Sequence, residues 1–150
     1  MRRQTLGLRH RWDIYEAVVA LAWADAKLTL SEVRAARTIA SELDLLGPFS
    51  LAGKMLRGRH ARLPDGPPPS GEETMDKNAA AAIYASAAWV AQVDGQVHRR
   101  ESIALGRLRR RLRIDASDAQ RLERIARSRG TSPTRPVYRR VLADCLSKSA

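Results

Sequence analysis

The sequence contains one phrase twice, and this internal repeat is the feature that most constrains the fold. Residues 15–43 read YEAVVALAWADAKLTLSEVRAARTIASEL, and residues 84–112 read YASAAWVAQVDGQVHRRESIALGRLRRRL. A shift of 69 positions aligns the two copies without a gap, with Tyr15 on Tyr84, Asp25 on Asp94, Glu32 on Glu101 and Leu43 on Leu112. Each copy predicts an apolar helix that ends at an Asp, a tight turn, and a Glu that opens a second helix.

Helical periodicity runs through the chain, and no window shows the sustained period-two alternation of a strand. We predict an all-α fold, a bundle of about seven helices made of two pseudo-symmetric halves. Because neither half can bury its apolar face alone, the halves should pack on each other. The helices are expected at about residues 11–24, 29–43, 50–56, from a start between 70 and 76 to 93, 99–113, 117–128 and 136–147.

A chain of 150 residues fits a single domain. We expect a first repeat at about 12–57, a proline-rich linker at 58–71, a second repeat at about 72–129 and a C-terminal helix at about 136–147. The lone Cys145 excludes an internal disulfide framework and fits a reducing compartment. The sequence contains no signal-peptide pattern and no apolar run that could span a bilayer. We therefore expect a cytoplasmic protein that does not insert into membranes.

Two helix starts have a capping signature. Thr29 and Glu32 match the T-x-x-E capping box, in which each side chain bonds the backbone N–H of the other residue. Ser117 and Gln120 form a second such pair, which predicts that the sixth helix begins at this serine.

The repeated phrase, Asp-Gly-x-aliphatic-x-x-x-Glu after an Ala-rich helix, resembles the TerB-like family. This family comprises tellurite-resistance-associated proteins and the related N-terminal-like domain of DjlA-type co-chaperones. The resemblance covers about residues 12–129. The second copy fits the phrase fully at Asp94, Gly95, Val97 and Glu101. The first copy fits it at Asp25, Leu28 and Glu32, with Ala26 in place of the glycine.

The resemblance implies an α-helical protein of the bacterial cytoplasm with a non-catalytic role in stress response or tellurite resistance. It also implies that the acidic residues of the phrase bind a metal. In this sequence the candidate metal ligands are Asp25, Glu32, Asp94 and Glu101. The candidate cofactor is a divalent cation, Ca²⁺ or Mg²⁺, because hard cations prefer oxygen ligands.

A purely structural role explains the same residues without a metal. The two Glu side chains fit the first turn of a helix, where a carboxylate is stabilised by the helix dipole. The spacing from Asp94 to Glu101 also coincides with positions 5 to 12 of an EF-hand loop. An EF-hand needs oxygen ligands at its first and third positions, and Val90 and Gln92 stand there. The sequence therefore argues against an EF-hand and leaves the choice between a capping role and another kind of cation site open.

The positive charge of the chain is concentrated in its second half. The whole sequence carries a net charge of +11, and residues 97–140 alone carry 14 basic and 4 acidic side chains, a net charge of +10. Arg107, Arg110 and Arg111 lie on the side of their helix opposite a leucine stripe, and they are candidate anion-binding residues. The alternatives are a solvated helix face and a surface for an unknown protein partner or a polyanion, which includes nucleic acid, an acidic protein and lipid headgroups.

No catalytic motif is present in the sequence. A nucleophile elbow, a Walker loop, a dinucleotide-binding glycine motif and a histidine pair with metal-ligand spacing are all missing. Cys145 lies on the predicted buried stripe of the last helix, which is typical of a core cysteine. The sequence therefore predicts a protein that is not an enzyme.

Overall fold

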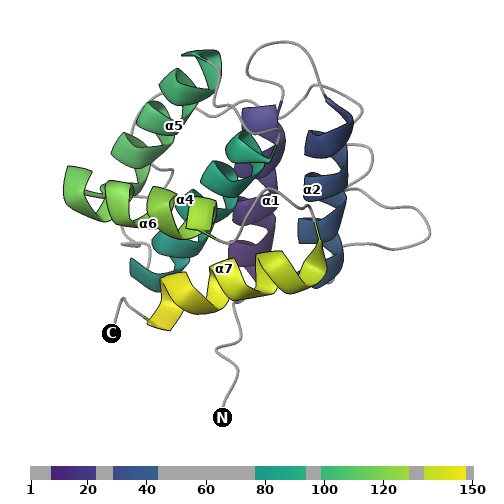
Figure 1. The fold of residues 1–150 in the computed structure, drawn as a ribbon. Helices are drawn as coiled ribbons and strands as arrows, with labels where there is room; N and C mark the ends of the chain where they lie inside the picture. The colour runs from purple at the N-terminus through teal and green to yellow at the C-terminus, as the bar shows by residue number, and fades with distance from the viewer. Residues whose placement is uncertain (1–7, 23–28, 44–76, 94–98, 129–133, 148–150) are drawn as a thin grey trace.

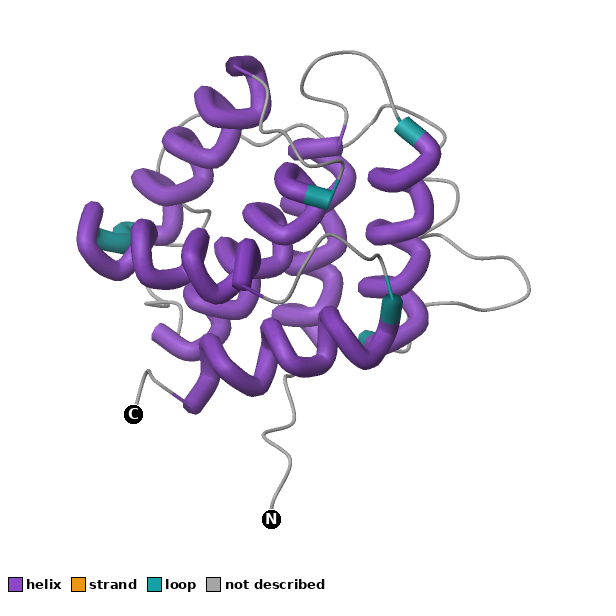
Figure 2. The backbone as a smooth tube through the Cα atoms, in the orientation of Figure 1, coloured by secondary structure: helices purple, strands orange, loops and turns teal. Residues whose placement is uncertain are grey.

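The computed structural model describes residues 8–22, 29–43, 77–93, 99–128 and 134–147. These residues form six α-helices and no strand, which confirms the all-α prediction (Figure 1, Figure 2). The helices are α1 (Leu8–Ala22), α2 (Leu30–Glu42), α4 (Lys77–Gln92), α5 (Arg99–Leu112), α6 (Ala116–Ser128) and α7 (Arg135–Ser147). None of them is long and apolar enough to cross a membrane.

Some predictions fall outside the described residues. They are the short helix at 50–56, the linker at 58–71 and the Asp-containing turns that begin at Asp25 and Asp94. The seventh helix and the pseudo-symmetric packing of two halves therefore stay predictions. The six helices that are described begin and end within a few residues of the predicted bounds.

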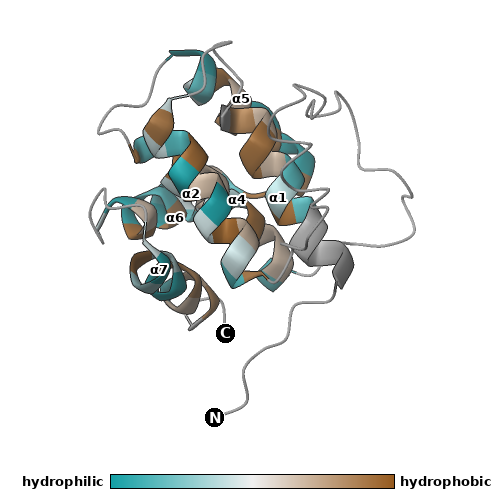
Figure 3. Cartoon of the chain, turned by 90° about the vertical axis from the view of Figure 1, so that its right-hand side faces the viewer, coloured by the Kyte–Doolittle hydropathy of each residue, from teal (hydrophilic) through white to brown (hydrophobic). Residues whose placement is uncertain are grey.

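Helix α4 lies at the centre of the bundle. It contacts all five other described helices, and Figure 3 shows it surrounded by them. Thirteen of its 16 residues are buried, from Ala79 to Ala91. Most of these are alanines, so neighbouring helix backbones can approach α4 closely from every side. This central position explains why the segment is apolar around its whole circumference, as helices buried on all faces are.

The surrounding helices are amphipathic and bury one face each. The leucine stripe of α5 is buried at Leu105 and Leu108 and half-buried at Leu112. In α6 the predicted inward residues Leu122, Ile125 and Ala126 are all buried. The stripe that the 3.6-residue period predicts is therefore the face that packs on the core.

The start of α6 differs from the prediction. The N-cap is Asp115, because its carbonyl accepts the first intrahelical bond from Ala119 N at 3.0 Å and its Oδ1 accepts a bond from Asp118 N at 2.8 Å. The hydroxyl of Ser117, the predicted cap, lies inside the helix and donates to the same Oδ1 at 2.9 Å. The backbone N–H of Asp118 and the Ser117 hydroxyl hold the pKa of Asp115 below its usual value, so this cap is an anion at the positive end of the helix.

Helix α7 attaches to α4 through a buried polar pair. Tyr138, Val141 and Cys145 face the core, and all three are fully buried. The Tyr138 hydroxyl lies 2.7 Å from the Ser86 hydroxyl, which in turn donates to Ala82 O at 2.6 Å. The Tyr138 ring also packs against Trp89, with ring centroids 5.1 Å apart. Because the Ser86 proton is used in α4, Tyr138 is the donor between the two hydroxyls.

A second contact joins α7 to α2 at the surface. Arg139 donates to both carboxylate oxygens of Glu42, at 2.9 Å and 3.2 Å, and Arg135 donates to Glu42 Oε2 at 3.1 Å. These bonds, Arg139 first, hold the pKa of Glu42 below its usual value against the opposing effect of desolvation. One carboxylate therefore receives three charge-assisted hydrogen bonds from a helix more than 90 residues away.

The two hydroxyl deletions should have unequal effects on stability. Ser86→Ala leaves the Tyr138 hydroxyl buried without an acceptor, which should lower the free energy of unfolding by about 1–3 kcal/mol. Tyr138→Phe leaves Ser86 bonded to Ala82 O, so its cost should be smaller, about 1 kcal/mol. Urea unfolding of the two single variants and the double variant measures this difference. Equal losses from both single variants would contradict the assigned direction of the bond.

Replacing Glu42 should reduce stability in a pH-dependent way. Because its folded-state pKa lies below the ordinary value of 4.5, its contribution is fully present above that pH and is lost as the pH falls through the folded-state pKa. Water screens the exposed arginines, so Glu42→Gln should cost about 1 kcal/mol or less at neutral pH. Thermal unfolding of both proteins between pH 7 and pH 2 should show the two stabilities converging at the acid end. A difference that grew on acidification would contradict this account.

Candidate functional site

The first-copy glutamate, Glu32, forms the predicted capping box at the start of α2. Glu32 N donates to Thr29 Oγ1 at 3.2 Å, and Glu32 Oε1 accepts from Thr29 N at 3.4 Å and from Thr29 Oγ1 at 2.9 Å. The backbone of Thr29 is extended, as a residue just before a helix is. Glu32 is only 1% exposed, so this cap is built into the interior and not on the surface.

The second-copy glutamate, Glu101, occupies the matching place in α5. It is the third residue of its helix, as Glu32 is of α2, and it is also 1% exposed. Helices α1 and α4 end, and α2 and α5 begin, at the same end of the bundle (Figure 1). Both glutamates therefore lie in the first turns of helices that start at this end.

The structure does not show the four candidate metal ligands as one cluster. Asp25 and Asp94 lie outside the described residues, and α2 and α5 do not pack against each other to any extent. Among the residues that the structure describes, no group of three or more His, Cys, Asp or Glu side chains is placed to hold a metal ion. The argument against an EF-hand is strengthened, because Val90 is fully buried within α4 and that helix continues to Gln92.

The candidate anion-binding residues lie along the outer side of α5. Arg107 and Arg110 are exposed and Arg111 is half-buried, on the side opposite the buried leucines. Arg110 Nε also donates to Gly106 O at 3.3 Å, one turn earlier in the helix. Further exposed arginines are Arg99 and Arg100 on α5, Arg124 and Arg127 on α6, and Arg139 and Arg140 on α7.

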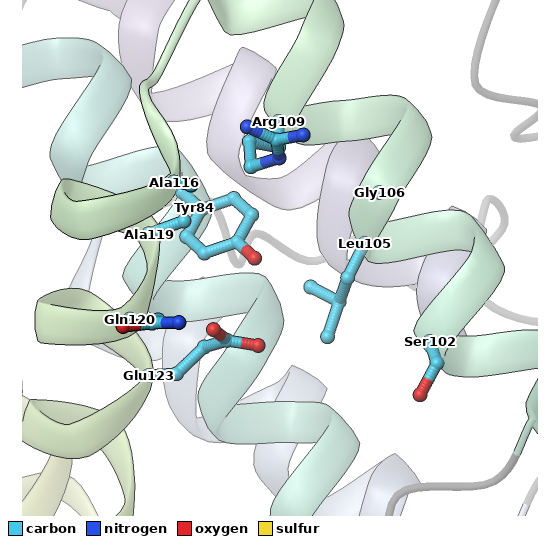
Figure 4. Close-up of a pocket in the computed structure, with 9 residues that line it drawn as sticks. All are labelled: Tyr84, Ser102, Leu105, Gly106, Arg109, Ala116, Ala119, Gln120 and Glu123. Carbon is cyan, nitrogen blue, oxygen red and sulfur yellow. The ribbon is translucent and has the colours of Figure 1, made fainter.

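A pocket that the sequence analysis did not predict lies between α5 and α6, over α4. It has a volume of about 300 Å³ and is shown in Figure 4. Both helices pack on α4 but hardly on each other, so a groove with α4 as its floor separates them. The lining residues are Tyr84, Ser102, Leu105, Gly106, Arg109, Ala116, Ala119, Gln120 and Glu123. One sequence signal was available: Gly106 is an isolated glycine within a helical pattern, where alanine would be more favourable.

A tight turn fixes one end of this groove. Ile114 N donates to Arg109 O at 3.1 Å and Arg113 N donates to Arg110 O at 3.2 Å, which is the Schellman pattern of a helix end. Arg113 stands at the left-handed position with a φ of 57°, where glycine is usual. Helix α6 begins at Ala116, so three residues turn the chain from one wall of the pocket to the other.

The Cys145 thiol and the Tyr84 phenol are held in their neutral forms at physiological pH. Burial raises the pKa of the Cys145 thiol to about 12, so the reactive thiolate is scarce at neutral pH. Burial, and secondarily the negative charge of Glu123, raises the pKa of Tyr84 to about 12. The Tyr84 phenol is therefore a hydrogen-bond donor and not a base at physiological pH.

The chain matches no family model, no curated protein and no solved structure in comparisons with each.

Proposed function

We propose that this chain is a non-catalytic, TerB-like protein of bacterial stress response or tellurite resistance that acts by binding a ligand or partner. The observation that carries the proposal is the burial of Glu32 and Glu101 at the same position in the two copies of the repeat. Glutamate is rarely fully buried, and a helix cap alone does not need a buried carboxylate. Two matched buried carboxylates support a shared role for the two turns.

A weakly held divalent cation is the ligand that this chemistry favours. Carboxylate oxygens suit Ca²⁺ and Mg²⁺, but these ions take six or more oxygen ligands. Glu32 and Glu101 would supply part of the set, and Asp25, Asp94, backbone carbonyls and water would have to supply the rest. The strongly basic second half of the chain works against cation binding. The expected affinity is therefore low.

A non-catalytic role fits the chemistry of the described side chains. Cys145 is the only cysteine, and its burial and raised pKa argue against a nucleophile. The described hydroxyl groups serve the fold: Ser86 donates its proton to a backbone carbonyl, and Thr29 and Ser117 donate theirs to carboxylates at helix starts. Binding is the activity that these residues support.

Calorimetry with Ca²⁺ and Mg²⁺ tests the cation. Glu32→Gln and Glu101→Gln remove the carboxylates but keep a side chain that can complete a capping box. We expect the parent protein to bind with a dissociation constant of about 10⁻⁴–10⁻³ M and each variant at least about tenfold more weakly. Glu16→Gln, which changes a half-buried glutamate of α1 that is not one of the four candidate ligands, should leave the affinity unchanged.

The cation role would be contradicted if the parent protein bound neither cation and Glu32→Ala lowered the free energy of unfolding in metal-free buffer by about 1 kcal/mol. Helix capping alone would then explain why a glutamate occupies position 32.

An Arg-mediated polyanion-binding function is the alternative. It is favoured by the exposure of Arg107 and Arg110, together with the net charge of +10 on residues 97–140. Such a surface would neutralise phosphates without reading base identity. Aromatic side chains that could stack on single-stranded bases are few, with 5% aromatic residues in the chain, so duplex nucleic acid is the better probe.

The salt dependence of binding to duplex DNA tests this alternative. Replacing Arg107, Arg110 and Arg111 together by Gln should reduce the slope of log K against log salt by about 2–3, because each neutralised phosphate contributes about 0.9. Fluorescence anisotropy at a series of salt concentrations measures the slope. A matched control replaces three exposed arginines of α2 and α7, namely Arg34, Arg37 and Arg140, and should change it less. Absence of binding at about 50 mM salt would remove nucleic acid as a partner.

A further inference from the structure

The α5–α6 pocket has charges of opposite sign at its two ends. Arg109 of α5 lies at the end near the turn, and Glu123 of α6 lies at the other, with the Tyr84 hydroxyl between them (Figure 4). Beyond the effect of burial, the charge of Glu123 raises the pKa of Tyr84 and the charge of Arg109 lowers it, so both charged groups act on the Tyr84 hydroxyl. Leu105 and Ala119, both buried, supply the apolar part of the lining.

The two charged groups are positioned by the surrounding structure. Arg109 NH1 donates to Ile114 O at 3.4 Å, so the turn between the helices holds the guanidinium at the pocket. This bond uses one donor of five, and the others can still meet an anion. Glu123 lines the pocket beside the Tyr84 hydroxyl, and its carboxylate has acceptor sites for a ligand. Arg109 is therefore held in place by the turn, and both charged groups keep bonding capacity for a ligand.

Gly106 has no side chain, and it borders open space at the wall of the pocket. A Cβ at this position would meet no atom within 4 Å, so the space beside α5 is empty there. Glycine inside a helix is unfavourable relative to alanine. Helix α5 is otherwise rich in leucine and arginine. The glycine at position 106 therefore fits a need for space at the pocket wall.

We propose that this pocket binds a small zwitterion whose ammonium group meets Glu123 and whose carboxylate meets Arg109. The volume of about 300 Å³ is at the lower end for small-molecule sites, which suits an ω-amino acid or a dipeptide. The Tyr84 hydroxyl and the apolar lining lie where the uncharged middle of such a molecule would pass. A polyanion does not fit this pocket because Glu123 would repel it. The inference is independent of the cation and polyanion functions proposed above.

Titration calorimetry with 5-aminopentanoate and glycylglycine, two zwitterions with separated charges, tests the proposal. We expect saturable binding with a dissociation constant of about 1 mM, an ordinary affinity for so small a ligand. Pentanoate and pentylamine each carry only one of the two charges. Each should bind at least about tenfold more weakly, the loss typical of one charge-assisted hydrogen bond.

Variants of the pocket decide whether binding occurs there. Gly106→Leu should abolish binding by filling the space, whereas Gly106→Ala, which adds a single methyl group, should retain it. Arg109→Gln and Glu123→Gln should each weaken binding about tenfold or more, and Arg34→Gln, at an exposed position of α2 away from the pocket, should not. Circular dichroism confirms that each variant is folded.

Three results would overturn the proposal. They are no saturable binding of either zwitterion, binding of pentylamine or pentanoate as tight as that of the zwitterions, and unchanged affinity in a folded Gly106→Leu variant. Because neither a cation nor DNA is present in these titrations, a negative result would leave the proposed function untouched.

Discussion

Burial of the alanine-rich helix α4 is the interaction on which the rest of the structure depends. Every other described helix contacts it, and residues from Ala79 to Ala91 are shielded on all sides. An alanine helix loses almost no side-chain entropy on folding and allows close backbone approach. The cost is that α4 supplies little apolar surface of its own. The leucines, isoleucines and valines of the surrounding helices must therefore supply most of the hydrophobic stabilisation.

The same central helix explains the position of the pocket. Because α5 and α6 both pack on α4 and hardly contact each other, the space between them is closed by α4 on one side and open on the other. Tyr84 is the large polar residue that α4 presents there, and it lines the pocket together with Glu123 of α6. On another side of α4, Ser86 bonds the hydroxyl of Tyr138 on α7. The two hydroxyl groups of an otherwise apolar helix thus lie against two different neighbouring helices.

The elements of the fold were predictable where the signal is local. The 3.6-residue period identified the buried face of α5 at Leu105 and Leu108, and the spacing of Thr29 and Glu32 identified the start of α2. Asp115 was missed because two good capping residues stand two positions apart, and the choice between them depends on the preceding turn. That turn has a left-handed residue, Arg113, whose identity gives no sign of its conformation.

Contacts between distant segments were not predictable. Ser86, the hydrogen-bond partner of Tyr138, is 52 residues away in the sequence. No pattern within α7 distinguishes this buried tyrosine from one at the surface. The candidate ligands Glu32 and Glu101 were found from the repeat, but their burial was not, because glutamate in a first helical turn is usually solvated. The pocket depends on how far apart two helices lie on a third, which is a property of tertiary packing alone.

The composition of α4 also determines which mutations the protein can accept during evolution. In most cores the damaging change is a loss of volume, since a large side chain is replaced by a small one. Here residues such as Ala87 and Ala88 are fully buried against neighbouring helices, so the damaging change is a gain of volume that pushes those helices apart. Substitutions should therefore accumulate slowly along α4, and its buried alanines should accept little beyond glycine or serine. The outer faces of α5 and α6, which carry exposed arginines such as Arg107 and Arg124, are free to change much faster.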